Sequence, residues 1–102
     1  MAGKIYRKHN RNAHDSVLEA FEEYGKRLIW TAKLINFSTG GASFSTKRDL
    51  KKGQLIFARL RIPEQGVMQV TGKVVWIKEK TSTFVYGMKF DSIKQIRQSN
   101  LA

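Results

Sequence analysis

The chain of 102 residues contains no cysteine, which removes a whole group of functions at once. Disulfide scaffolds, thiolate nucleophiles and cysteine-ligated zinc sites all require that side chain. The only imidazoles belong to His9 and His14, and they flank Arg11 in a basic stretch that would repel a metal cation. We therefore expect no metal site.

Long apolar segments are also missing. The first ten residues are mostly polar and basic, so they do not match the apolar core of a signal peptide. No run elsewhere reaches the ~20 apolar residues that a membrane-spanning helix needs. The sequence therefore predicts a cytoplasmic protein without membrane insertion.

Acidic residues are scarce relative to basic ones. Eight Asp and Glu stand against 19 Lys and Arg, which leaves a formal net charge of +11. A charge this far from zero on so small a domain exceeds what solubility requires and favours an anionic partner. Nucleic acid, an acidic membrane surface, a phosphorylated nucleotide and an acidic protein all fit, and charge alone does not choose between them.

The usual signs of catalysis are absent as well. Neither histidine is paired with a recognisable nucleophile, the acidic residues form no obvious couple, and no glycine-rich phosphate loop of the P-loop type occurs. The sequence favours a binding protein over an enzyme and gives no sign of a cofactor.

From Arg27 onward the sequence shows the two-residue alternation of β-strands. The alternation changes phase near Ile35 so that Phe37 faces inward, which indicates a bulge or a barrel corner. Pro63 ends one strand, because proline cannot donate to a sheet ladder. Short strands with close turns favour a small antiparallel β-barrel of about six strands, since closure removes unpaired edges. The fold class predicted is mainly all-β, with most of six aromatic residues in the core: Trp30, Phe57, Trp76, Phe84, Tyr86 and Phe90.

Helix signals occur near both ends of this strand-rich region. Asp91 can cap a short C-terminal helix that runs through Ile93, Ile96 and Leu101. Near the other end, Ser16-x-x-Glu19 resembles a capping box, so local signals favour a helix within residues 15–24.

Two short motifs stand out from the strand pattern. Residues 1–12 are basic and have few apolar groups, so we expect a flexible arm ahead of a single barrel domain at 13–102. Within this arm, Arg7-Lys8-His9-Asn10-Arg11 places two guanidiniums four residues apart. In the second motif, Asn36-Phe37-Ser38-Thr39-Gly40-Gly41, alternation puts Asn36 and Ser38 on one face. Its two glycines can take positive φ and let another molecule approach the backbone.

Together, Arg7-x-x-x-Arg11 and, after 24 residues, Asn36-x-Ser38-x-x-Gly41 resemble the two-part signature of the PilZ domain family, the receptors for cyclic di-GMP. Residues 72–76 (GKVVW) and 86–90 (YGMKF) also resemble later strands of that family, so the resemblance covers nearly the whole chain. It implies a first strand over residues 15–24, turned at 23–26, and we adopt this prediction over the helix. It further implies a bacterial signalling domain that acts on a downstream protein target.

The resemblance also implies a ligand site. A guanidinium can fork onto guanine O6 and N7, pair with a phosphate or stack on a purine, so Arg7 and Arg11 are expected to clamp cyclic di-GMP. Lys8 adds attraction to phosphate. The Asn36 carboxamide is expected to accept hydrogen bonds from guanine nitrogens, and the Ser38 hydroxyl is expected to bond guanine or phosphate. An amide accepts less strongly than the Asp more common in the family.

In that site, Gly41 is expected to keep the turn low, and Gly40 is expected to belong to the site as well. The alternative function is a small basic barrel that binds single-stranded nucleic acid through a basic groove and stacked aromatic rings.

Overall fold

The structure is a computed structural model that describes residues 16–22, 27–63 and 65–97. This part of the chain contains no helix, and so none that could cross a membrane. It consists of β2 (Val17–Phe21), β3 (Leu28–Phe37), β4 (Gly41–Thr46), β5 (Leu55–Ile62), β6 (Gly66–Glu79) and β7 (Phe84–Arg97).

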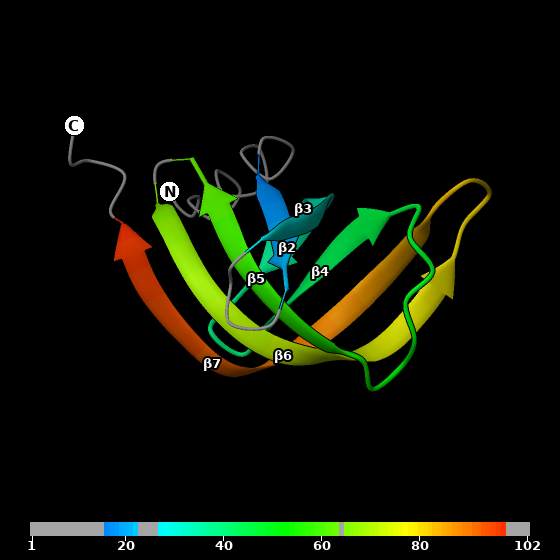
Figure 1. Ribbon diagram of the computed structural model, residues 1–102. Helices are drawn as coiled ribbons and strands as arrows, with labels where there is room; N and C mark the ends of the chain where they lie inside the picture. Colours follow the sequence, from blue (N-terminus) through cyan, green and yellow to red (C-terminus); the bar gives the residue numbers. More distant parts are fainter. Residues whose placement is uncertain (1–15, 23–26, 64, 98–102) are drawn as a thin grey trace, which may run out of the picture.

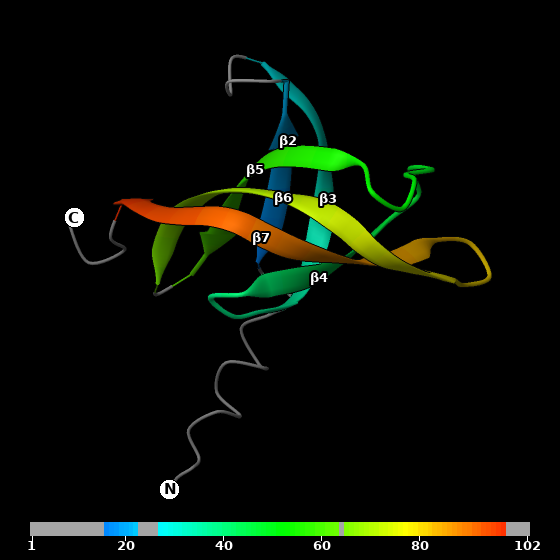
Figure 2. The same ribbon diagram turned by 90° about the horizontal axis from the view of Figure 1, so that it is seen from below.

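These six strands close into a barrel in the order β2-β3-β4-β7-β6-β5 (Figure 1). All neighbouring pairs are antiparallel, and β2 closes the ring by pairing with β3 on one edge and β5 on the other. The 14-residue strands β6 and β7 form a curved hairpin that reaches beyond the other strands (Figure 2). The predicted fold class, a small antiparallel β-barrel, is confirmed.

The first strand settles the choice between helix and strand near Ser16. Leu18 pairs with Ala32 of β3 and with Leu60 of β5, so the backbone of β2 is bonded on both edges. Pairing on two edges outweighs a local helix signal of this size, and the strand prediction is confirmed. The turn expected at residues 23–26 lies outside the described residues.

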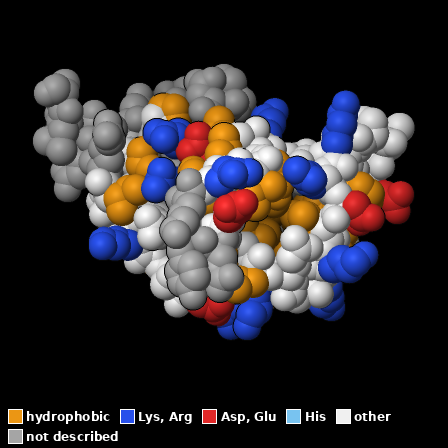
Figure 3. Space-filling view, viewed as in Figure 1, with side chains coloured by type: hydrophobic (Ala, Val, Ile, Leu, Met, Phe, Trp, Pro, Cys, Tyr) orange, Lys and Arg blue, Asp and Glu red, His pale blue; other side chains and the backbone are white. Residues whose placement is uncertain are grey.

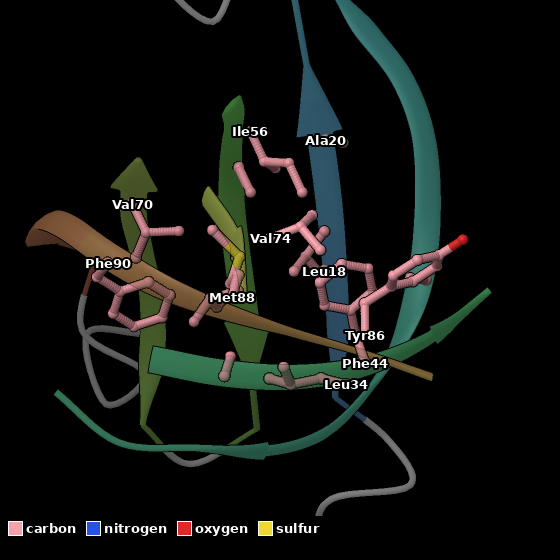
Figure 4. Close-up of a cluster of buried hydrophobic side chains, with 14 of the residues drawn as sticks. Leu18, Ala20, Leu34, Phe44, Ile56, Val70, Val74, Tyr86, Met88 and Phe90 are labelled. Atoms are coloured by element: carbon pink, nitrogen blue, oxygen red, sulfur yellow. The ribbon is translucent and has the colours of Figure 1, made fainter. Parts of the chain in front are cut away.

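The barrel interior is filled by inward side chains from all six strands (Figure 4). Phe44 is fully buried, with its ring centroid 5.6 Å from that of Tyr86 and 5.9 Å from that of Trp30. Full burial of an aliphatic or aromatic side chain contributes roughly 1.5–3 kcal/mol, so this cluster dominates the stability of the fold. Its largest fully buried members are Leu18, Phe44, Leu60, Val70, Val74 and Tyr86.

The Tyr86 hydroxyl ties the loop between β4 and β5 to this core. It accepts a hydrogen bond from the Leu50 backbone N–H at 2.8 Å and donates one to the Arg48 carbonyl at 2.6 Å. Figure 4 shows the hydroxyl pointing out of the apolar cluster. Leu50 itself is buried, so the basic loop that contains it has a fixed position on the barrel.

The prediction that a helix begins at Asp91 is wrong for the described residues. Residues 91–97 instead continue β7, where Ile93 pairs with Val70 and Ser92 pairs with Thr71. The Ser92 and Thr71 hydroxyls also share a hydrogen bond of 2.7 Å. Pairing with β6 supplies backbone hydrogen bonds along the length of this segment, whereas a capping side chain bonds only one end of a short helix. Residues 98–102 lie outside the described residues.

Two of the six aromatic residues assigned to the core lie outside it: Phe57, which is partly buried beside Phe21 and Arg59 at a surface pocket, and Trp76. Tyr86 and Phe90 are buried and Trp30 and Phe84 pack against the core, whereas Trp76 is 45% exposed. The register between β6 and β7 shifts between Val74 and Trp76, so an extra residue at Val75 reverses the alternation. Trp76 therefore lies on the outer face.

Candidate functional site

Residues 36–41 cross from β3 to β4 through a short, well-bonded turn. The Ser38 N–H donates to the Gly41 carbonyl at 2.9 Å, and the Gly40 N–H donates to Ser38 Oγ at 3.2 Å. The Gly40 carbonyl accepts from the Phe90 N–H at 2.9 Å, which fixes the turn to β7. The turn is thus part of the barrel wall.

Within this turn the side chains face as the alternation predicted. Asn36 and Ser38 are exposed, while Phe37 packs against the core. The phase change predicted near Ile35 is a shift of register between Leu34 and Asn36. That bulge brings Asn36 to the outer face, where it can meet a ligand.

Ser43 holds the Asn36 side chain in place. The two residues are partners across the β3–β4 pair, and Ser43 Oγ donates to Asn36 Oδ1 at 2.9 Å. Ser43 is only 7% exposed, so its hydroxyl has little water to bond. The sequence analysis missed Ser43, although a hairpin turned at Gly40 and Gly41 places it near Asn36.

The two glycines of the turn do not adopt the positive φ that the sequence analysis allowed them. Neither Gly40 nor Gly41 has positive φ; the described glycines that do are Gly53 and Gly66. A Cβ at Gly41 would overlap the Met88 carbonyl oxygen, so this glycine allows β7 to approach closely. A Cβ at Gly40 would meet only Ser38 Oγ, at 4.0 Å.

A row of four residues on the outer face joins this turn to Trp76. Asn36 pairs with Ser43, Ser43 with Gly87, and Gly87 with Trp76, so the row crosses β3, β4, β7 and β6. The Trp76 indole occupies the space that a Cβ at Gly87 would need. The ring therefore lies over Gly87, two strands from Asn36, and we call these four residues the outer row.

Basic side chains line both sides of the outer row. Gly41 pairs with Lys89 and Lys89 with Lys73, and both lysines are exposed. On the other side a shallow groove of about 440 Å³ is bordered by Lys33 and Lys80. Figure 3 shows Lys and Arg side chains spread over another face of the molecule as well, with few Asp and Glu between them. An exposed aromatic ring with polar side chains and lysines beside it can hold an anion that carries a flat ring.

Three predicted site residues lie outside the described residues: Arg7, Lys8 and Arg11. Their position relative to Asn36 therefore stays a prediction. Within the ranges that are described, no group of three His, Asp or Glu side chains could hold a metal ion.

The chain matches the model of a known protein family. The family model described as PilZ domain matches residues 6–102. The match covers both motifs, from the first arginine of the arm through the last strand. Comparisons with curated proteins and with solved structures give no match.

Proposed function

Because the chain belongs to the PilZ domain family, which consists of cyclic di-GMP-binding domains rather than enzymes, we propose that it is a cyclic di-GMP receptor whose ligand lies on the outer row. The observation that carries this proposal is that Asn36 and Ser38 are both exposed and both hydrogen-bonded to the protein. Asn36 accepts a hydrogen bond from Ser43, and Ser38 accepts one from the Gly40 N–H. Such pre-ordered polar groups lower the entropic cost of binding.

The outer row and the residues beside it suit different parts of the ligand. Asn36 and Ser38 offer hydrogen bonds to a guanine edge or a phosphate, and Lys89 lies beside them as a point charge. The half-exposed ring of Trp76 offers a stacking surface for a purine. A base stacked on an aromatic ring contributes about 1–3 kcal/mol.

Arg7 and Arg11 supply the remaining contacts in this proposal. The arm at residues 1–12 folds across the barrel when the ligand arrives, and the two guanidiniums clamp guanine and phosphate, with Lys8 adding attraction. Ordering the eight residues from 5 to 12 consumes on the order of 8–16 kcal/mol, so the arm docks only when anionic groups compensate. The change in the arm is the signal offered to a downstream protein.

Single-stranded nucleic acid remains the alternative ligand for a basic barrel, and the family match gives it no support. Titration calorimetry separates the two functions. We expect cyclic di-GMP to bind with a dissociation constant of about 1 μM or tighter, roughly 8 kcal/mol. No binding of cyclic di-GMP, together with tight binding of a mixed single-stranded oligonucleotide, would overturn the proposal.

The same titration locates the site. Asn36→Ala and Ser38→Ala should each weaken binding about tenfold, because each removes a hydrogen bond to a charged or polar ligand group. Ser92→Ala is the matched control, since Ser92 also makes a cross-strand hydroxyl bond but lies beyond the outer row. Equal affinities for all three variants would place the ligand elsewhere.

A further inference from the structure

The bond between Ser43 and Asn36 fixes which atom of the carboxamide faces outward. Ser43 is nearly buried, and its hydroxyl carries one proton that must find an acceptor. Asn36 Oδ1 accepts that proton at 2.9 Å. If the carboxamide were rotated by half a turn, its NH₂ group would face Ser43, and the hydroxyl proton would lose this acceptor. The side chain therefore turns its oxygen toward β4 and its Nδ2 donor away from Ser43.

We propose that Ser43 is a positioning residue that makes Asn36 a hydrogen-bond donor toward the ligand. This inference rests on the proposed function and specifies which ligand atoms Asn36 recognises. A donor at Nδ2 matches guanine O6 and N7 or a phosphate oxygen, which are acceptors. It does not match guanine N1–H or the exocyclic amino group, which are donors themselves. The contact expected from Asn36 in the sequence analysis, acceptance from guanine nitrogens, is thereby reversed.

The same geometry explains why this positioning matters for asparagine in particular. A carboxylate has two equivalent oxygens, so an Asp at position 36 presents an acceptor outward whichever oxygen bonds Ser43. A carboxamide has one oxygen and one nitrogen, and only one of its two orientations presents a donor. Loss of the Ser43 hydroxyl should therefore harm the Asn36 protein more than the Asn36→Asp variant.

A double-variant titration tests the inference with cyclic di-GMP as the probe. Ser43→Ala should weaken binding by about three- to tenfold in the Asn36 protein, as expected for loss of one hydrogen bond, and by less than twofold in Asn36→Asp. Ser43→Thr keeps the hydroxyl and should retain affinity within about twofold. Ser92→Ala, which removes the 2.7 Å bond to Thr71, should leave affinity unchanged.

The outcomes separate the possible failures. Wild-type protein that does not bind cyclic di-GMP overturns the proposed function and this inference with it. Wild-type protein that binds while Ser43→Ala shows no loss, or an equal loss in both backgrounds, overturns the inference alone. Equal losses would mean that Ser43 contacts the ligand or only supports the strand.

A second measurement avoids Ser43 variants, in case they fail to fold. The inosine analogue cyclic di-IMP lacks the exocyclic amino donor of guanine. The proposal predicts that replacing cyclic di-GMP by this analogue weakens binding more in Asn36→Asp than in the wild-type protein, because only the carboxylate accepts from that amino group. An equal or larger loss in the wild-type protein would overturn it.

Discussion

Removal of the Tyr86 hydroxyl is the sharpest test of how the barrel holds its basic loop. Tyr86→Phe keeps the ring, which packs at centroid distances of 5.6 Å from Phe44 and 5.8 Å from Phe84. It removes two hydrogen bonds, one from the Leu50 N–H and one to the Arg48 carbonyl. Since Tyr86 is fully buried, water cannot easily replace the hydroxyl.

The size of the stability loss depends on the two backbone groups that Tyr86→Phe leaves without a partner. A buried donor without a partner costs about 1–3 kcal/mol, and Leu50 is 4% exposed, so its N–H falls in this class. The Arg48 carbonyl belongs to an exposed residue and can bond water, so its loss adds little. We expect a loss of about 2 kcal/mol in the free energy of unfolding, which for a domain of this size lowers the melting temperature by about 8–16 °C.

Thermal and urea unfolding followed by circular dichroism measure this loss directly. Thr46→Val is the matched control, because the Arg48 N–H bonds Thr46 Oγ1 at 3.2 Å in the same loop but at an exposed position. This control should change stability by less than about 0.5 kcal/mol. A melting temperature for Tyr86→Phe within 2 °C of the control would refute the argument that the hydroxyl fixes the loop.

Three further outcomes are expected. Arg11→Ala should weaken cyclic di-GMP binding more than Lys8→Ala at moderate salt, because a bidentate contact costs more to lose than a screened exposed charge; calorimetry giving equal losses would reduce the arm to unspecific attraction. Gly87→Ala should displace the Trp76 indole, shift its fluorescence emission and weaken ligand binding, whereas unchanged emission would contradict the position of the ring over Gly87. Amide exchange at residues 5–12 should slow sharply on adding ligand, and an arm already protected in the free protein would favour a preformed pocket.

Much of the barrel could be predicted because its alternation is local. The phase change at Ile35 was visible in the sequence, since polar Asn36 and Ser38 follow an apolar series. The corresponding bulge at Val75 was not visible, because Val74, Val75 and Trp76 are all apolar and hide any change of phase. A continuous apolar run fits either register, so only the pairing with β7 decides which side chain faces outward.

The candidate site divides in the same way. Asn36 and Ser38 were found because both lie in one short motif, whereas Ser43 and Trp76 reach the site only through strand pairing. The strand at Asp91 was missed for a related reason. Its partners on β6 lie more than twenty positions earlier in the chain, so the residues around Asp91 do not indicate the pairing.

The outer row has a consequence for when the protein can respond. Its four residues come from four strands, between positions 36 and 87, so the row does not exist until β7 has joined both β4 and β6. A chain emerging from the ribosome, or one that has lost the β6–β7 hairpin, does not contain the complete outer row. A ligand that spans the row therefore binds only the folded barrel. At a free ligand concentration of 100 times the dissociation constant, this binding adds about 2.7 kcal/mol to the free energy of unfolding. Rising messenger concentration would thus lengthen the lifetime of the protein as well as change its signal, because fewer molecules open far enough for a protease to cut.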